Sequence, residues 1–143
     1  MIYLDTSVLV AYYCPEPLSR AAERVARSVP APSISDLCEV EFASALARKV
    51  RQAEVSRLDA ERIWRQFISH TEQRLYTRIP LERGHYQMAR DWIARFEGAL
   101  KALDALHLAV AAEQGLVLVS ADRGLVSAAA ARGVKARMPT VDQ

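Results

Sequence analysis

Short apolar runs alternate with longer amphipathic stretches along the whole chain. Wholly apolar runs such as Ile2–Leu4 and Val117–Val119 are typical of strands that are buried on both faces of a parallel sheet. The stretches between them repeat apolar residues at the spacing of a helix. We therefore expect strands at Ile2–Leu4, Ser33–Ser35, Leu75–Ile79, Val117–Val119 and, at an edge, Val134–Ala136, with helices at Val8–Tyr13, Leu18–Ser28, Leu37–Ala53, Ser56–Glu72, Leu81–Phe96, Leu103–Gln114 and Arg123–Ala131.

Prolines, glycines and small polar residues mark the boundaries of these elements. Pro15 and Pro17 end the first helix, Ser19 is a candidate N-cap for the second, and Gly115 is a stop signal for the helix before it. The alternation of strands and helices predicts one α/β domain over residues 1–143. We expect three layers, with helices on both faces of a parallel sheet of four to five strands. In such sheets, functional sites lie beyond the carboxyl ends of the strands.

Composition places the chain among ordinary globular proteins, with 51% hydrophobic and 25% charged residues. The longest apolar run, Val8–Cys14, is too short to span a bilayer, and the first residues show no basic secretory signal. We therefore expect a cytoplasmic protein without a membrane partner. Cys14 and Cys38 lack the spacing of a metal or redox motif and are expected to be reduced and buried.

The net charge of +2 hides a strong preference for arginine, which supplies 16 of the 19 basic residues. Arginine makes bidentate contacts to phosphate, so the surface could receive a nucleic acid. The alternative is that arginine-rich helices only reflect a GC-rich genome.

Four acids lie inside or at the end of apolar segments, where an unpaired charge is costly. Asp5 and Asp122 each follow a predicted strand, so they are expected to meet at one edge of the sheet. Glu41 and Asp104 lie on predicted helices, with apolar neighbours on the same face. Carboxylates that converge repel one another, and a divalent cation relieves this repulsion. Oxygen ligands of this kind favour Mg²⁺ or Mn²⁺.

Each acid also has a purely structural explanation. Asp5 and Asp122 could be plain helix N-caps. Asp104 could pair with His107, which lies one helical turn further along. The sequence does not favour a zinc site, because the three histidines lack the spacing of zinc ligands: His70, His85 and His107.

Together these segments resemble the PIN-domain ribonucleases, and in particular the VapC toxins of prokaryotic toxin–antitoxin pairs. The resemblance lies in Leu4-Asp5-Thr6-Ser7, in the helix entry from Ser35 to Glu41, in Leu103–Ala109 and in Val119–Asp122. It covers nearly the whole chain in length, order and spacing, and the first and third segments are the most specific. The chain departs from the family at Glu39, where an apolar or small residue is more common. Glu39 therefore competes with Glu41 for the role of the second acid.

The resemblance implies that Asp5, Glu41, Asp104 and Asp122 are the catalytic residues and hold Mg²⁺ or Mn²⁺. It implies a Mg²⁺-dependent endoribonuclease that hydrolyses RNA phosphodiester bonds. It further implies inhibition by a small VapB-type antitoxin, a homodimer and possible larger toxin–antitoxin assemblies. The residues expected to position water or substrate are Thr6, Ser7, Ser120 and Arg123.

Two functions from other classes stay open at this point. One is a PIN-like module with weak or no catalytic activity that acts as an RNA-binding or assembly domain. The other is a metal-dependent phosphatase of the haloacid dehalogenase type, which expects an aspartate where Ser7 stands. Some apolar residues of the predicted helices, assigned mainly to the core, could instead line a groove for a partner helix: Ile63, Trp64, Phe67, Trp92 and Phe96.

Overall fold

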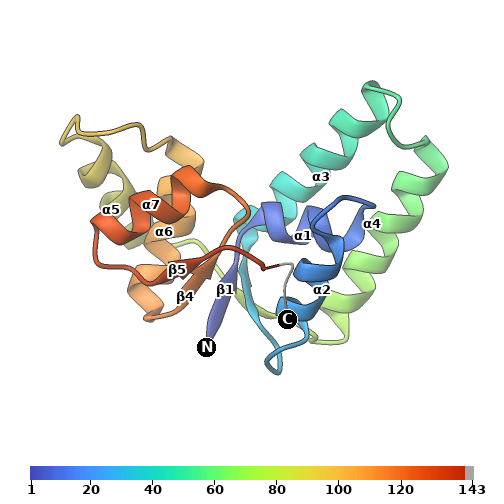
Figure 1. Ribbon diagram of the computed structural model, residues 1–143, viewed down its shortest axis with the longest axis horizontal. Coiled ribbons are helices and arrows are strands. Elements are labelled where there is room, and N and C mark those ends of the chain that lie inside the picture. The colour runs from blue at the N-terminus through green and yellow to red at the C-terminus, as the bar shows by residue number, and fades with distance from the viewer. Residues whose placement is uncertain (141–143) are drawn as a thin grey trace.

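Within residues 1–140, the part of the chain that the structure describes, five parallel strands form the centre of the fold (Figure 1). The computed structural model places them in the order β3 (Thr77–Ile79), β2 (Ser33–Ser35), β1 (Ile2–Leu4), β4 (Val117–Val119) and β5 (Ala136–Arg137). Each strand pairs in parallel with its neighbours. The expected parallel sheet is therefore confirmed, and β1 lies between β2 and β4.

Helices cover both faces of this sheet and complete the three layers. They are α1 (Thr6–Tyr13), α2 (Ser19–Ala26), α3 (Asp36–Arg51), α4 (Arg57–Glu72), α5 (Arg83–Ile93), α6 (Ala102–Gln114) and α7 (Arg123–Ala131). In Figure 1, α5, α6 and α7 lie on one side of the strands, and α1 to α4 lie on the other. Every expected helix is present, which confirms the α/β class.

The helices that follow β1 and β4 begin at aspartates. The Asp5 carboxylate accepts a hydrogen bond from the Val8 N–H at 3.3 Å. The Asp122 carboxylate accepts from the N–H groups of Gly124 and Leu125 at 2.8 and 3.3 Å. Both acids are therefore helix N-caps. Because Asp5 directly follows β1 and Asp122 comes shortly after β4, capping and a position at the sheet edge occur together.

The prediction of Ser19 as the N-cap of α2 is wrong. Ser19 is the first helical residue, and Leu18 occupies the cap position. The Ser19 hydroxyl accepts from the Glu16 N–H and donates to the Cys14 carbonyl, both at 2.9 Å, so it holds the turn between α1 and α2. Gly115 ends α6 as predicted, with a left-handed φ of 65° that glycine adopts without steric cost.

The other boundaries differ from the predicted ones mainly near α4 and α5. Strand β3 begins at Thr77, because the Leu75 N–H donates to the His70 carbonyl and closes the last turn of α4. Helix α5 is shorter at both ends than the predicted range 81–96. The edge strand predicted at 134–136 forms at Ala136–Arg137 instead.

The apolar residues of the helices belong mainly to the core. Phe67 is fully buried, and Ile63, Trp64 and Trp92 pack partly buried against the same core cluster. Phe96 is the exception, since 91% of its surface is exposed. The core assignment is therefore correct for these residues apart from Phe96.

Both cysteines have the expected state. Cys14 and Cys38 are free and buried, and burial raises the pKa of the Cys14 thiol, which makes it a poor nucleophile at neutral pH. Within residues 1–140, no helix combines the length and apolar character needed to cross a membrane.

Candidate active site

Asp5 and Asp122 lie at the same edge of the sheet. Asp5 follows β1 and Asp122 comes shortly after β4, and these two strands pair with Leu4 opposite Val119. The Asp5 N–H donates to the Val119 carbonyl at 3.1 Å, so the ladder of hydrogen bonds continues up to the first acid. The fold thus brings two acids that are far apart in sequence to the carboxyl ends of adjacent strands.

The two helical acids converge on the same region. Asp104 lies in the first turn of α6 and is half-buried. Burial raises the pKa of the Asp104 carboxyl, and the charge of Asp122 raises it further. The charges of Asp5 and Glu41 act in the same direction, while that of His107 opposes them. The charges of the other three acids therefore all disfavour ionisation of Asp104, and these four acids are called the acid cluster below.

Asp5 is the most buried acid of this cluster, with 4% of its surface exposed. Burial raises the pKa of the Asp5 carboxyl, and hydrogen bonds with Ser120 and Ser7 offset part of this effect. The Ser7 hydroxyl donates to Asp5 at 2.5 Å and accepts from the Ala121 N–H at 2.9 Å. Ser7 therefore connects Asp5 to the loop that carries Asp122.

Glu41 is held by donors from two other helices. The Thr6 hydroxyl of α1 donates to Glu41 Oε1 at 2.6 Å, and His107 Nε2 of α6 lies 2.5 Å from the same oxygen. Burial raises the pKa of Glu41, but the hydrogen bond and charge of His107 outweigh it, so the net shift is downward. Burial also lowers the pKa of His107, but hydrogen bonds with Cys38 and Glu41 raise it to about 10. At neutral pH the two side chains are therefore an ion pair.

Glu39 and Glu41 have different surroundings. Glu39, the competitor of Glu41, forms an ion pair with Arg78 of the edge strand β3 at 3.6 Å. Glu41 is the acid whose charge reaches Asp104. The suggested pairing of His107 with Asp104 is wrong, because the hydrogen-bonding partner of His107 on the acid cluster is Glu41.

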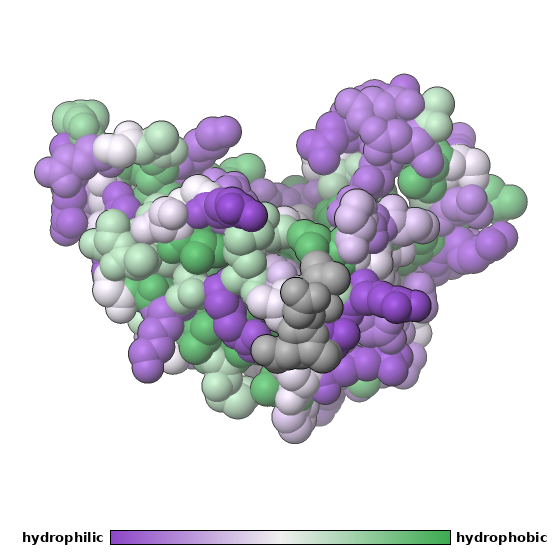
Figure 2. Space-filling view, in the orientation of Figure 1, coloured by the Kyte–Doolittle hydropathy of each residue, from purple (hydrophilic) through white to green (hydrophobic). Residues whose placement is uncertain are grey.

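A cleft with a volume of 470 Å³ lies beside the acids. Figure 2 shows the surface hollowed between the α3–α4 arm and the side that carries α5 to α7. Arg48 is exposed in this cleft and lies about two turns beyond Glu41 on α3. Its guanidinium can bind phosphate in a bidentate manner. The residues that line the cleft include Thr6, Ser7, Glu41, Arg48, Leu103 and Ala121.

Ser120 and Arg123 flank Asp122. Ser120 is fully buried, and its hydroxyl accepts from the Asp122 N–H at 3.0 Å, so it shapes the loop that presents this acid. Arg123 is exposed at the first position of α7. The structure thus gathers every predicted site residue near the carboxyl ends of β1 and β4.

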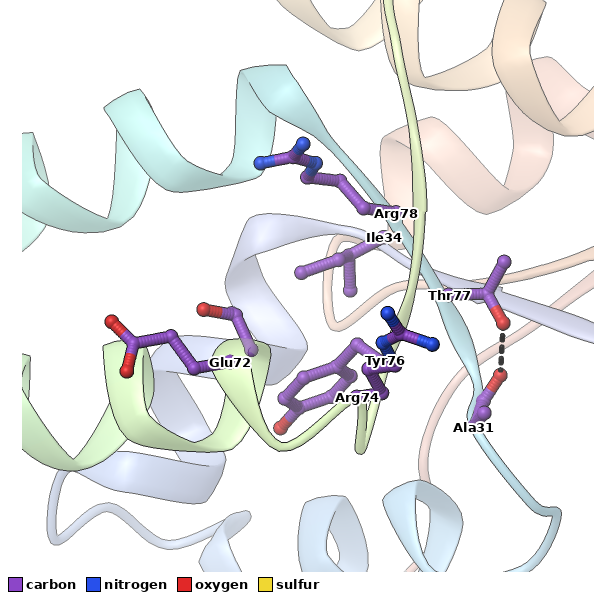
Figure 3. A pocket seen from close by; sticks show the side chains of 8 residues that line it. Ala31, Ile34, Glu72, Arg74, Tyr76, Thr77 and Arg78 are labelled. Atoms are coloured by element: carbon purple, nitrogen blue, oxygen red, sulfur yellow. Dashed lines mark hydrogen bonds between the residues drawn. The ribbon is translucent and has the colours of Figure 1, made fainter.

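A larger cavity, of 620 Å³, lies between the end of α4 and strands β2 and β3 (Figure 3). The Thr77 hydroxyl donates to the Ala31 carbonyl at its wall, at 3.0 Å. The charged residues that line it are Glu72, Arg74 and Arg78, and none of the predicted site residues does so. One acid and two arginines offer no converging carboxylates, so the size of a cavity alone does not identify the active site.

The acid cluster is an open set of oxygen donors. Within residues 1–140, no three His, Cys, Asp or Glu side chains lie close enough to enclose a metal ion in their present conformations. Mg²⁺ keeps several water ligands and needs only about one or two carboxylates as direct ligands, so this set fits Mg²⁺ or Mn²⁺. It does not fit structural zinc, which needs a closed tetrahedral set. Burial raises the pKa of the Asp5 and Asp104 carboxyls, and a nearby cation would favour their ionised forms.

Three residues of this region are not identified as site residues by the sequence patterns: Tyr3, Arg48 and His107. The Tyr3 hydroxyl lies 2.6 Å from His107 Nδ1, but in sequence Tyr3 reads as one more apolar residue of a buried strand. A histidine within the apolar run of α6 is expected to have a buried hydrogen-bonding partner, but the sequence does not identify which residue this is. Arg48 could be found from its helical spacing to Glu41.

Solved structures of other proteins share this fold. FitAcB from Neisseria gonorrhoeae has a TM-score of 0.72 at 18% identity, covering 97% of this chain and 98% of its own. VapC20 from Mycobacterium tuberculosis, a Sarcin-Ricin loop cleaving toxin, has a TM-score of 0.71 at 18% identity, covering 90% and 95%. DNA-bound VapBC from Salmonella typhimurium has a TM-score of 0.67 at 16% identity, covering 98% and 100%. At these identities the likeness is one of fold.

The sequence itself gives the family. No curated protein matches it. The PIN domain, however, matches residues 2–131, from the start of β1 to the end of α7, and this range includes all four acids. This chain belongs to the PIN domain family.

Proposed function

We propose that this protein is a Mg²⁺-dependent endoribonuclease of the toxin type, which hydrolyses RNA phosphodiester bonds and is inhibited by a cognate antitoxin. The observation that carries the proposal is the position of the acids: Asp5 and Asp122 follow the paired strands β1 and β4, and Glu41 accepts a hydrogen bond from Thr6, the residue after Asp5. A cluster of this kind at the carboxyl ends of parallel strands suits a divalent cation and a phosphodiester. Membership of the PIN domain family supports the same activity.

In the proposed mechanism, Asp5, Asp104 and Asp122 would hold Mg²⁺ directly or through water, and Mn²⁺ could replace it. The ion would supply a bound water of lowered pKa and would stabilise negative charge on the phosphate oxygens. Glu41 would orient the attacking water as a general base or help to hold a second ion. Its lowered pKa keeps this carboxylate ionised at neutral pH.

The other site residues would position the carboxylates and the RNA. Thr6 and Ser7 donate hydrogen bonds to Glu41 and Asp5, so they fix these two carboxylates. Ser120 holds the loop of Asp122 in the same way. Arg48 in the cleft and the exposed Arg123 would bind phosphate groups of the RNA backbone.

The proposed partner is a small VapB-type antitoxin whose C-terminal segment would cover the cleft of a homodimeric toxin. A structure of similar fold, at a TM-score of 0.64, is a toxin-antitoxin complex from Klebsiella pneumoniae. Leu103, which is 48% exposed and lines the cleft, offers an apolar contact for such a segment. A small neighbouring reading frame whose product blocks cleavage would support this part of the proposal.

Cleavage of total RNA by Asp5→Asn and Asp104→Asn tests the activity. We expect discrete fragments from the wild-type protein with Mg²⁺ and none after chelation. Each variant should lose at least about 100-fold in rate, because a group that acts in the transition state contributes this much. The fold should remain intact, since each change removes a charge without leaving a void.

Asp91→Asn is the matched control, because Asp91 is an exposed acid of α5 that pairs with Arg90. Its rate should equal that of the wild type. Loss of cleavage in the site variants, purified in the same way, excludes a contaminating nuclease as the source of the fragments. Full activity in both site variants would refute the assignment.

A further inference from the structure

His107 is buried where four elements meet, and it contacts the acid cluster through Glu41. Its side chain is 3% exposed, whereas that of Glu41 is 23% exposed. His107 therefore lies behind Glu41, away from solvent, and is not placed to touch an RNA in the cleft. Any part that it plays in the proposed reaction must act through Glu41.

A line of buried hydrogen bonds fixes the His107 ring. Tyr3 of β1 has its hydroxyl 2.6 Å from His107 Nδ1 and 2.8 Å from the Ser35 hydroxyl at the end of β2. Tyr3 and Ser35 are fully buried. Within residues 1–140, the one buried side-chain polar atom without a hydrogen-bonding partner is Arg132 Nε. The line from the sheet to Glu41 is thus fully satisfied, which makes it rigid.

Both donors to Glu41 meet the same carboxylate oxygen. Thr6 Oγ1 and His107 Nε2 contact Oε1 at 2.6 and 2.5 Å. No hydrogen bond from the described part of the chain reaches Oε2. Because Glu41 lines the cleft, this arrangement locks one oxygen and leaves the other for whatever the cleft binds.

We propose that His107 is a positioning residue, which holds Glu41 Oε1 so that Oε2 is presented to the attacking water. This inference rests on the proposed function and names a residue that acts behind its catalytic carboxylate. Partners that orient a catalytic or metal-binding carboxylate from behind commonly affect activity by about 10- to 100-fold.

Stability alone is a weak reason for this ion pair. Removing charges from water is costly, and well-packed apolar residues often replace a buried pair without loss of stability. Val110 and Ala111, about one turn further along the same side of α6, are fully buried apolar residues. Fixing Glu41 is a role that an apolar residue cannot fill.

The experiment compares His107→Leu with His107→Gln on a cleavable RNA oligonucleotide. Leucine fills the space without a donor, whereas glutamine keeps an N–H that can reach Glu41. We expect kcat to fall about 10- to 100-fold in His107→Leu, with KM unchanged, and to recover largely in His107→Gln. A crystal structure of metal-free His107→Leu should show the Glu41 carboxylate displaced or in more than one conformation. If His107→Leu does not fold, His107→Asn, which is too short to reach Glu41, replaces it with the same expectation.

His85→Leu is the matched control, because His85 is also buried and also lies near a glutamate, Glu113. It should leave kcat unchanged for each folded molecule. Wild-type kcat in a folded His107→Leu, or an unmoved Glu41 in its crystal structure, would overturn the inference and leave the proposed function standing. Absence of cleavage by the wild-type protein with Mg²⁺ would overturn the proposed function itself, and the position of Glu41 in the crystal would still decide whether His107 fixes it.

Discussion

Helix α6 takes part in two pairs in which a buried histidine lies beside a glutamate. His107 of α6 lies 2.5 Å from Glu41 of α3, and His85 of α5 lies 3.4 Å from Glu113 of α6. Both histidine side chains are 3% exposed, but the glutamates differ, at 23% for Glu41 and 44% for Glu113. The shorter pair is thus also the one more shielded from water.

The second ring nitrogen separates the two pairs more clearly. His85 Nδ1 accepts from the Glu82 N–H at 3.0 Å, so it caps the beginning of its own helix. His107 Nδ1 contacts Tyr3, which is 104 residues away in sequence. One histidine therefore completes a local turn, and the other joins remote parts of the chain at a functional edge. The two histidines are equally buried, and the contacts of the whole ring distinguish their roles.

The largest difference should appear between Glu41→Gln and Glu113→Gln. Glutamine cannot act as a general base, so Glu41→Gln should lower RNA cleavage by about 100-fold or more. Glu113→Gln changes the same chemical group in the other pair and should cleave at the wild-type rate. Single-turnover assays with Mg²⁺ measure both. Equal rates in the two variants would remove the functional distinction between the pairs.

A smaller effect concerns stability and pH in the absence of divalent metal. The pKa of His107 is raised from 6.5 to about 10, so the folded state binds this proton more tightly than the unfolded state. The stabilisation is fully present below pH 6.5 and is lost as the pH rises through about 10. Urea unfolding should therefore show a larger gap between wild type and His107→Gln at pH 7 than at pH 10. The same gap at both values would contradict a charged His107.

The smallest effect is expected for Tyr3→Phe. This change deletes the hydroxyl that contacts His107 and Ser35 and should cost about 1–3 kcal/mol of unfolding free energy, because buried partners lose a hydrogen bond. Cleavage should fall only a few-fold, since Thr6 still holds Glu41. Tyr76→Phe is the control, as Tyr76 is a buried tyrosine bonded to the Tyr13 hydroxyl at 2.6 Å. Tyr76→Phe should lose comparable stability at unchanged kcat. An equal loss of kcat in both variants would contradict an effect of Tyr3 on cleavage through His107 and Glu41.

The elements near the site could be predicted because local signals and burial agree there. Helix α7 begins and ends at the predicted residues, since Asp122 caps it and an apolar face follows. The position of Asp5 and Asp122 at one edge follows from parallel pairing alone. Where two local hydrogen-bonding roles were available to one residue, prediction failed: Ser19 resembles an N-cap, but its hydroxyl bonds the turn before the helix.

The partner of His107 could not be predicted for a related physical reason. The helical neighbour Asp104 is one turn away on the same element, which is the only kind of pairing that spacing reveals. Glu41 reaches His107 only because α3 and α6 both start at the carboxyl edge of the sheet. The partner of His107 therefore depends on how whole helices pack against one another, and no short segment of sequence encodes this packing.

The strand order also has a consequence for the time course of synthesis. A ribosome makes β1 and Asp5 long before it makes β4 and Asp122, and β1 cannot gain its second neighbour until residue 119 has left the exit tunnel. A truncated nascent chain therefore lacks both the Val119 carbonyl that anchors Asp5 and the last acid of the cluster. Under the proposed function, a nascent chain that stops before Asp122 would be unable to cut the messenger RNA that encodes it, and cleavage would begin only after this residue has left the tunnel.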